Sequence, residues 1–227
     1  MSNSIKVLHG RSSFLEQHLY LDEKTFEDFC KLQESALKNG INLQVVSGFR
    51  NFDRQVLIWN QKASGKRKVY SRSGKRIDVN SSEKKELLEG ILFYSAIPGF
   101  SRHHWGSDID VYDANKLSKE FVELTPDECG PGGVFYDLHL WLDREIKTNQ
   151  SFGFFRPYEN DNGGVSQEKW HLSHYPTASK YEDMLSLENF INELNNTEIL
   201  LKDEILKDPE YYFKKYVINT DSPPRKV

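Results

Sequence analysis

Two short stretches of the sequence gather histidine and carboxylate side chains into a small space. In the first, "SRHHWGSDIDVYD", His103 and His104 precede Gly106, and Asp108 and Asp110 follow it. Glycine permits a sharp change of backbone direction. The alternation in "SDIDVYD" predicts a strand with both aspartates on one face. A histidine before such a turn and an aspartate after it can point at one spot, which a metal site requires.

The second stretch, "EKWHLSH", carries Glu168, His171 and His174 at intervals of three residues. A zinc ion needs about four donors, and a catalytic zinc keeps one position for water. Cys30 and Cys129 form no cluster, so the donors would be histidine and carboxylate. Two histidines, one carboxylate, a water and an unligated glutamate to take a proton are the minimal set for a zinc hydrolase. Any single histidine could still be an ordinary structural residue, but the two clusters together favour metal chemistry.

The elements that position these stretches can be predicted from periodicity and caps. "LDEKTFEDFCKLQESALKNG" predicts a helix with Asp22 as N-cap and Gly40 just beyond its end. "INLQVVSGF" is rich in β-branched residues and predicts a strand, and a second helix is expected to begin near Asn51 or Phe52. Arg50 therefore lies at a strand-to-helix junction.

Later segments predict further helices and strands. "SSEKKELLEGILFYSAIPGF" indicates a capped helix that ends near Pro98, and "CGPGGVFYDLHLWLDREI" a glycine-rich turn that leads into a helix. "FGFFRPYENDNGGVSQEKWHLSHYP" is typical of strand, loop and strand, and residues 179–216 are strongly helical and charged. We expect a catalytic domain over residues 1–178 and a helical C-terminal extension over residues 179–227.

The segment "KASGKRKVYSRSGKRIDV" is rich in cations interspersed with glycine and serine, which predicts an exposed, flexible loop. Two interpretations stay open, namely a merely solvated loop and a patch that attracts an anionic substrate or partner. Its cationic residues are Lys62, Lys66, Arg67, Lys68, Arg72, Lys75 and Arg76.

Bulk properties limit the class of protein. A chain of 227 residues with 37% hydrophobic residues can form one substantial core. A net charge of −4 gives no overall attraction to nucleic acid or to an anionic membrane, so neither is an expected partner. The first residues lack the apolar core of a signal peptide, and no segment is long and apolar enough to span a bilayer. We therefore expect a cytoplasmic protein; its oligomeric state is not indicated by the sequence.

Three motifs carry a resemblance to a known family. "SGFRNFDRQ", "SRHHWGSDID" and "EKWH" resemble, in order and spacing, the motifs of the zinc D,D-carboxypeptidases, which include the vancomycin-resistance enzymes and the related bacterial L,D-carboxypeptidases. The resemblance implies a zinc ion held by His103, Asp110 and His171. It also implies an α+β fold of the Hedgehog/D,D-peptidase kind, with a small, mostly antiparallel sheet that carries the zinc cleft and is surrounded by helices.

The resemblance assigns roles to four other residues. Glu168 matches the catalytic base that activates the attacking water and passes its proton to the leaving amine. Arg50 matches the arginine that stabilises the oxyanion. Ser101 and Gln55 match positions that help hold the terminal residue and its carboxylate.

This sequence departs from the family pattern at Asp108, where a small residue is usual. Asp108 either bonds to a histidine ligand or is solvated, and both alternatives stay open. His104 and His174 lie outside the ligand positions. Two roles stay open for them, namely contact with a metal ligand or with substrate, and a purely structural role.

The resemblance implies removal of a C-terminal D-alanine from peptidoglycan stem peptides or muropeptides. L,D-cleavage (tetrapeptide to tripeptide) is favoured over D,D-cleavage, because a cytoplasmic D,D-enzyme would destroy the pentapeptide precursor. The alternatives from another class are a non-catalytic module that binds cell-wall peptide and a metal-binding structural domain. Glu168 argues against both, because binding alone needs no general base.

Overall fold

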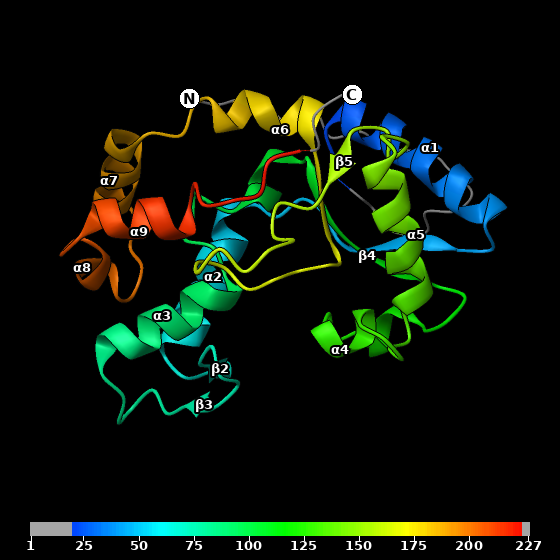
Figure 1. Ribbon diagram of the computed structural model, residues 1–227. Coiled ribbons are helices and arrows are strands. Elements are labelled where there is room, and N and C mark those ends of the chain that lie inside the picture. Colours follow the sequence, from blue (N-terminus) through cyan, green and yellow to red (C-terminus); the bar gives the residue numbers. More distant parts are fainter. Residues whose placement is uncertain (1–19, 224–227) are drawn as a thin grey trace.

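The computed structural model describes residues 20–223, and its centre is a four-stranded antiparallel sheet (Figure 1). The strands are β1 (Leu43–Ser47), β4 (Asp108–Asp113), β6 (His171–His174) and β5 (Phe154–Phe155), in that spatial order. The two chemistry-bearing stretches thus form the two neighbouring central strands. The N-terminal stretch that suggested a cytoplasmic protein lies outside the described residues.

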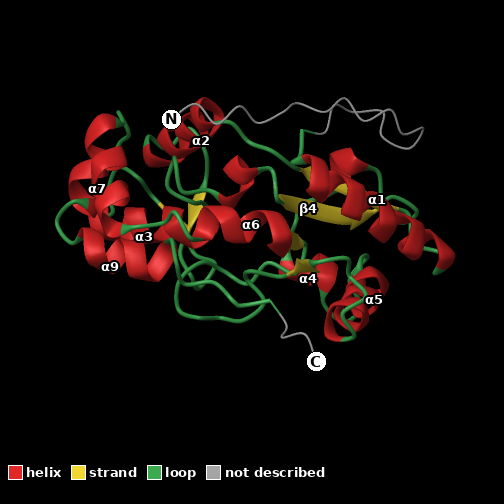
Figure 2. Ribbon diagram, turned by 90° about the horizontal axis from the view of Figure 1, so that it is seen from above, coloured by secondary structure: helices red, strands yellow, loops and turns green. Residues whose placement is uncertain are grey.

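Helices surround this sheet in two groups, each with its own hydrophobic cluster. One cluster joins α1 (Glu23–Lys38) and α5 (Tyr136–Lys147) to the sheet. The other joins α2 (Phe52–Ala63) and α3 (Lys84–Tyr94) to the C-terminal helices. Figures 1 and 2 show the two groups on opposite sides of the molecule. The expected α+β fold, a small antiparallel sheet surrounded by helices, is confirmed.

The shorter elements complete the chain. They are the 3-10 turns η1 (Arg102–Trp105) and η2 (Lys119–Phe121), and the helices α4 (Pro126–Cys129), α6 (Tyr175–Glu182), α7 (Leu187–Asn196), α8 (Lys202–Ile205) and α9 (Pro209–Tyr216). The expected boundary at residues 178 and 179 falls inside α6, so the division into two domains stays a prediction. No helix within residues 20–223 has both the length and the apolar character needed to cross a membrane.

The predicted helix ends near the site are confirmed. The Asp22 carboxylate accepts the backbone N–H groups of Lys24 and Thr25, and Gly40 follows the helix with a φ of 77°. Asn51 caps α2 by accepting the Arg54 N–H at 2.8 Å. These local bonds fix the end of β1 and the start of α2, and so the place of Arg50 between them.

Two local expectations were wrong. The third helix ends at Tyr94 rather than near Pro98, because Ser95 takes an extended conformation (φ −155°, ψ 128°) and leads the chain along a pocket wall. The basic segment is not simply a flexible loop, because it forms the hairpin β2 (Val69–Tyr70) and β3 (Arg76–Ile77). Buried Val69 and Ile77 attach the base of this hairpin to the second hydrophobic cluster.

Candidate metal centre

Three buried side chains converge beside the sheet, namely His103 from η1, Asp110 from β4 and His171 from β6. One nitrogen or oxygen atom of each lies within 4.8 Å of the others. The sheet explains part of this convergence, because Asp110 is paired directly with His171 across the β4–β6 ladder. Gly106 explains the rest, because its left-handed conformation (φ 70°) turns the chain from η1 back into β4.

The tautomer of His103 suits a metal ligand. Its Nδ1 lies 2.9 Å from the carbonyl oxygen of Gly48, and because a carbonyl only accepts, Nδ1 carries the proton. The Nε2 lone pair is then free, 3.5 Å from an Asp110 carboxylate oxygen. Burial lowers the pKa of His103 to about 4, although Asp110 opposes the shift. The ring is therefore neutral at pH 7, as metal binding requires.

His171 lies between three carboxylates. Its Nε2 donates to Asp108 Oδ1 at 2.9 Å, while Nδ1 lies 3.0 Å from Glu168 Oε2 and 3.7 Å from Asp110 Oδ1. Burial alone would lower the pKa of this ring, but its bonds to Asp108 and Glu168 raise it to about 10. Nδ1 is thus the atom that faces Asp110 and the one available to a metal once its proton leaves.

Asp108, the departure from the family pattern, is fully buried and bonded to His171, a candidate ligand, rather than solvated. It also accepts from Arg102 Nε at 2.9 Å, from Ser173 Oγ at 3.1 Å and from the Ser107 hydroxyl. Burial would raise the pKa of Asp108, but the Arg102 guanidinium and the other donors hold it well below its usual value. A permanently ionised carboxylate on the far nitrogen of a histidine fixes its orientation and increases its basicity toward a metal.

Arg102 continues this chain of bonds away from the centre. Its side chain is 4% exposed, and it donates to Glu182 in α6 and to Ser173 in β6, both at 2.7 Å. Its guanidinium also lies 4.7 Å from the Trp105 ring centroid. Residues of η1, β6 and α6 therefore hold the Asp108 carboxylate, either directly or through Arg102.

Glu168 lies at the edge of the centre and on the wall of a pocket. Its backbone N–H donates to the Tyr158 carbonyl at 2.9 Å, which holds the residue just before β6. Its side chain is 15% exposed, more than those of the three candidate ligands. Glu168 can therefore reach both the centre and solvent.

Arg50 faces the same pocket and is held from several directions. Its guanidinium donates to Gln55 Oε1 at 2.9 Å and to Ser47 Oγ at 3.3 Å. Gln55 Nε2 in turn donates to the Ala96 carbonyl at 2.7 Å, and Gln55 is fully buried. The oxygen and the nitrogen of the Gln55 amide thus both help to position Arg50 against residue 96. The expected contact of Gln55 with substrate stays a prediction.

The two other histidines support neighbouring structure. His104 donates from Nδ1 to the Arg50 carbonyl and accepts the Gly99 N–H at Nε2, which fixes the backbone that carries Arg50. His174 is bonded to Asp28 and to Thr25 in α1, so it joins β6 to α1 instead of facing the pocket.

The pocket over the centre has a volume of about 300 Å³. Ser101, which the resemblance assigns to substrate binding, lines it, and so does Trp170. The other residues of the wall were not predicted, because they belong to none of the three motifs and only the fold brings them to the pocket. They are Tyr94, Ser95, Ala96, Leu124, Tyr158 and Val165.

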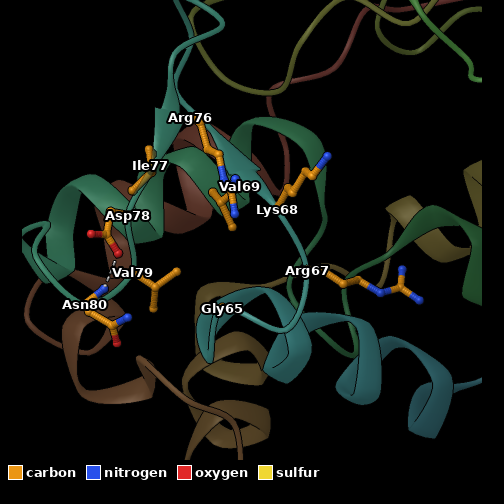
Figure 3. Close-up of a pocket in the computed structure, with 9 residues that line it drawn as sticks. All are labelled: Gly65, Arg67, Lys68, Val69, Arg76, Ile77, Asp78, Val79 and Asn80. Carbon is orange, nitrogen blue, oxygen red and sulfur yellow. Dashed lines mark hydrogen bonds between the residues drawn. The ribbon is translucent and has the colours of Figure 1, made fainter.

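A second pocket, of about 400 Å³, lies between the end of α2 and the β2–β3 hairpin (Figure 3). Arg67, Lys68 and Arg76 line it together with Asp78, and none of the metal-centre residues does. Arg72, from the tip of the hairpin, instead pairs with Asp161 at 2.7 Å. Most of the basic segment is therefore separate from the metal centre.

Comparison with known proteins identifies the family of this chain. A family model for VanY, described as D-alanyl-D-alanine carboxypeptidase, matches residues 18–177. Two uncharacterised proteins of Haemophilus influenzae are similar in sequence. One is 45% identical over 78 residues, 34% of this chain, and the chain spans only 53% of its length. The other is 30% identical over 134 residues, which cover 58% of this chain and 100% of that protein.

The solved structure of VanYB in complex with D-alanine-D-alanine shares the fold. It is 22% identical, covers 78% of this chain and 86% of its own, and has a TM-score of 0.50. The LdcB LD-carboxypeptidase is also 22% identical, with 75% of each chain covered and a TM-score of 0.43.

Proposed function

The chain belongs to the VanY family of D-alanyl-D-alanine carboxypeptidases, and on that basis we propose that it is a zinc carboxypeptidase that removes the C-terminal D-alanine from peptidoglycan stem peptides. The observation that carries the proposal is the buried convergence of His103, Asp110 and His171 beside an unligated glutamate. Two imidazoles and one carboxylate are a donor set that leaves a zinc site open. These three residues would hold the ion. When bound, zinc supplies a Lewis acid and makes water a stronger acid.

The proton steps fall to Glu168. Its carboxylate is within hydrogen-bond distance of the metal-facing nitrogen of His171, and its side chain also borders the pocket. This position supports the proposed role of Glu168, which is to take the proton of the attacking water and to return it to the leaving amine.

Arg50 would stabilise the negative charge that develops on the carbonyl oxygen. Gln55, Ser47 and the His104 bond to its backbone fix the guanidinium before substrate arrives. A preorganised donor of this kind contributes about 100- to 1,000-fold to the rate. Ser101 borders the pocket, where its hydroxyl would contact the terminal residue.

We further propose L,D-cleavage of tetrapeptides inside the cell, as in recycling of the wall. The supporting argument is chemical, because an enzyme that shares a compartment with the pentapeptide precursor must spare it. The description of the matched family favours the alternative, D,D-cleavage of pentapeptides.

A pair of substrates tests both the proposed carboxypeptidase activity and its L,D-specificity. Purified protein, loaded with zinc and analysed for metal, is incubated with tetrapeptide and with pentapeptide, and the products are identified by mass spectrometry. Release of D-alanine from the tetrapeptide supports L,D-cleavage, and conversion of pentapeptide that stops at tetrapeptide supports the alternative. A zinc-loaded protein that cleaves neither peptide would leave the binding module as the better account.

A further inference from the structure

One residue of the basic segment turns inward. Lys62, in the last turn of α2, donates from Nζ to the Ser95 hydroxyl at 2.6 Å. Ser95 lines the pocket over the metal centre. Lys62 lies two helical turns after Gln55, so both residues project from one face of α2 and bond to consecutive residues, 95 and 96.

This arrangement places two cations on one side of the pocket, with Arg50 in its lining and Lys62 behind Ser95. Gln55 ties the Arg50 guanidinium to residue 96, and Lys62 brings an ammonium to residue 95. Among residues 20–223, no carboxylate lies within ion-pair distance of Lys62, whereas the hairpin residue Arg72 pairs with Asp161. A half-buried ammonium without a counter-charge is costly, so a bound anion would be strongly favoured there.

The charge of Lys62 and the hydrogen bonding of Ser95 suit the binding of an anion. Burial and the nearby Arg67 and Arg50 lower the pKa of Lys62 to about 8, while Glu168 opposes them, so most of the side chain is still charged at pH 7. Because an ammonium only donates, the Ser95 oxygen acts as acceptor in their bond. In the described part of the chain its own O–H has no acceptor, so it can donate to a molecule in the pocket.

We propose that Lys62 and Ser95 together recognise the free C-terminal carboxylate of the substrate, and so make the enzyme specific for chain ends. The Ser95 hydroxyl donates to a carboxylate oxygen, and the Lys62 ammonium supplies the opposite charge. The inference rests on the proposed carboxypeptidase function. It assigns terminal recognition to residues outside the three sequence motifs.

The test compares Lys62→Met with Lys66→Met, a matched control from an exposed position in the same segment. Each zinc-loaded enzyme receives one stem peptide with a C-terminal D-alanine acid and the same peptide as the D-alanine amide. We expect Lys62→Met to lower kcat/KM for the acid by about 10- to 100-fold, the effect of losing a hydrogen bond to a charged group, mainly through KM. The amide should change less than about twofold, and Lys66→Met should behave like the unmodified enzyme.

Binding provides a second readout that does not need turnover. Calorimetric titration of the acid and the amide into the zinc-loaded Glu168→Gln protein, with and without Lys62→Met, should show the same selective loss for the acid. Ser95→Ala should reduce the preference for the acid in the same way, and melting temperatures check the fold of each variant. An equal effect of Lys62→Met on acid and amide, or none on either, would overturn the inference. Absence of hydrolysis together with selective binding of the acid would instead refute the proposed catalysis and leave this inference standing.

Discussion

The Asp108→Asn substitution tests how much the Asp108 carboxylate contributes to zinc affinity through its bond to His171. Asparagine keeps the size of the side chain but removes the charge that faces His171 Nε2 at 2.9 Å. Outer partners of metal ligands are worth about 10- to 100-fold in metal affinity, or about 1.4 to 2.7 kcal/mol. We expect the zinc dissociation constant of the variant to rise by that factor, because the neutral amide no longer increases the basicity of the ring.

The same change should weaken the metal-free fold. Asp108 is fully buried and its partner Arg102 is 4% exposed, so the substitution leaves a buried guanidinium without its fully buried counter-charge. Removing one partner of a buried ion pair costs about 3 to 5 kcal/mol. Arg102 keeps Glu182 at 2.7 Å, and we therefore expect a loss near the lower end, about 3 kcal/mol.

Asp113→Asn is the matched control, because Asp113 is another buried aspartate of β4. Its carboxylate accepts the backbone N–H groups of Asn42 and Asn115, both at 3.0 Å, and within residues 20–223 it has no histidine partner. Zinc affinity is measured by competition with a chelator, and stability by urea unfolding of the metal-free protein. Unchanged zinc affinity in Asp108→Asn, or equal losses of affinity in the two variants, would refute the assigned role of Asp108.

Three other predictions concern the ligands, the base and a buried histidine. His103→Ala and His171→Ala should each abolish binding of one zinc ion per chain, as checked by metal analysis; a variant that retained full zinc and activity would exclude that residue as a ligand. Glu168→Gln should lower kcat by about 100- to 10,000-fold while zinc content stays normal, and near-normal turnover would contradict its role as base. Burial, with Arg156 and Lys169 adding to it, lowers the pKa of His139 to about 3, below that of an unfolded histidine. The unfolded chain therefore binds this proton first, so stability falls as pH drops from about 6.5 toward 3, by about 2 kcal/mol at pH 5. His139→Leu should flatten this acid limb in urea unfolding at pH 7 and pH 5, and an unchanged slope would disprove the assignment.

The sequence by itself determined the features that depend on near neighbours along the chain. The N-cap at Asp22, the start of α2 near Asn51 and the turn at Gly106 were all predictable, because each depends on the backbone within a few residues. The shared strand face of Asp108 and Asp110 follows from the two-residue period of a strand. The family resemblance assigns the three motifs to one zinc site, which their positions along the chain alone do not show.

Only the tertiary structure decided what distant side chains do with one another. Register between β4 and β6 sets Asp110 opposite His171, and burial of Asp108 with Arg102 makes Asp108 a partner of His171 instead of a solvated group. A lysine in a basic segment looks like its neighbours in sequence, yet Lys62 turns inward to Ser95. The physical reason is that strand pairing and the direction of a long side chain depend on packing between segments remote in sequence, which local propensity does not encode.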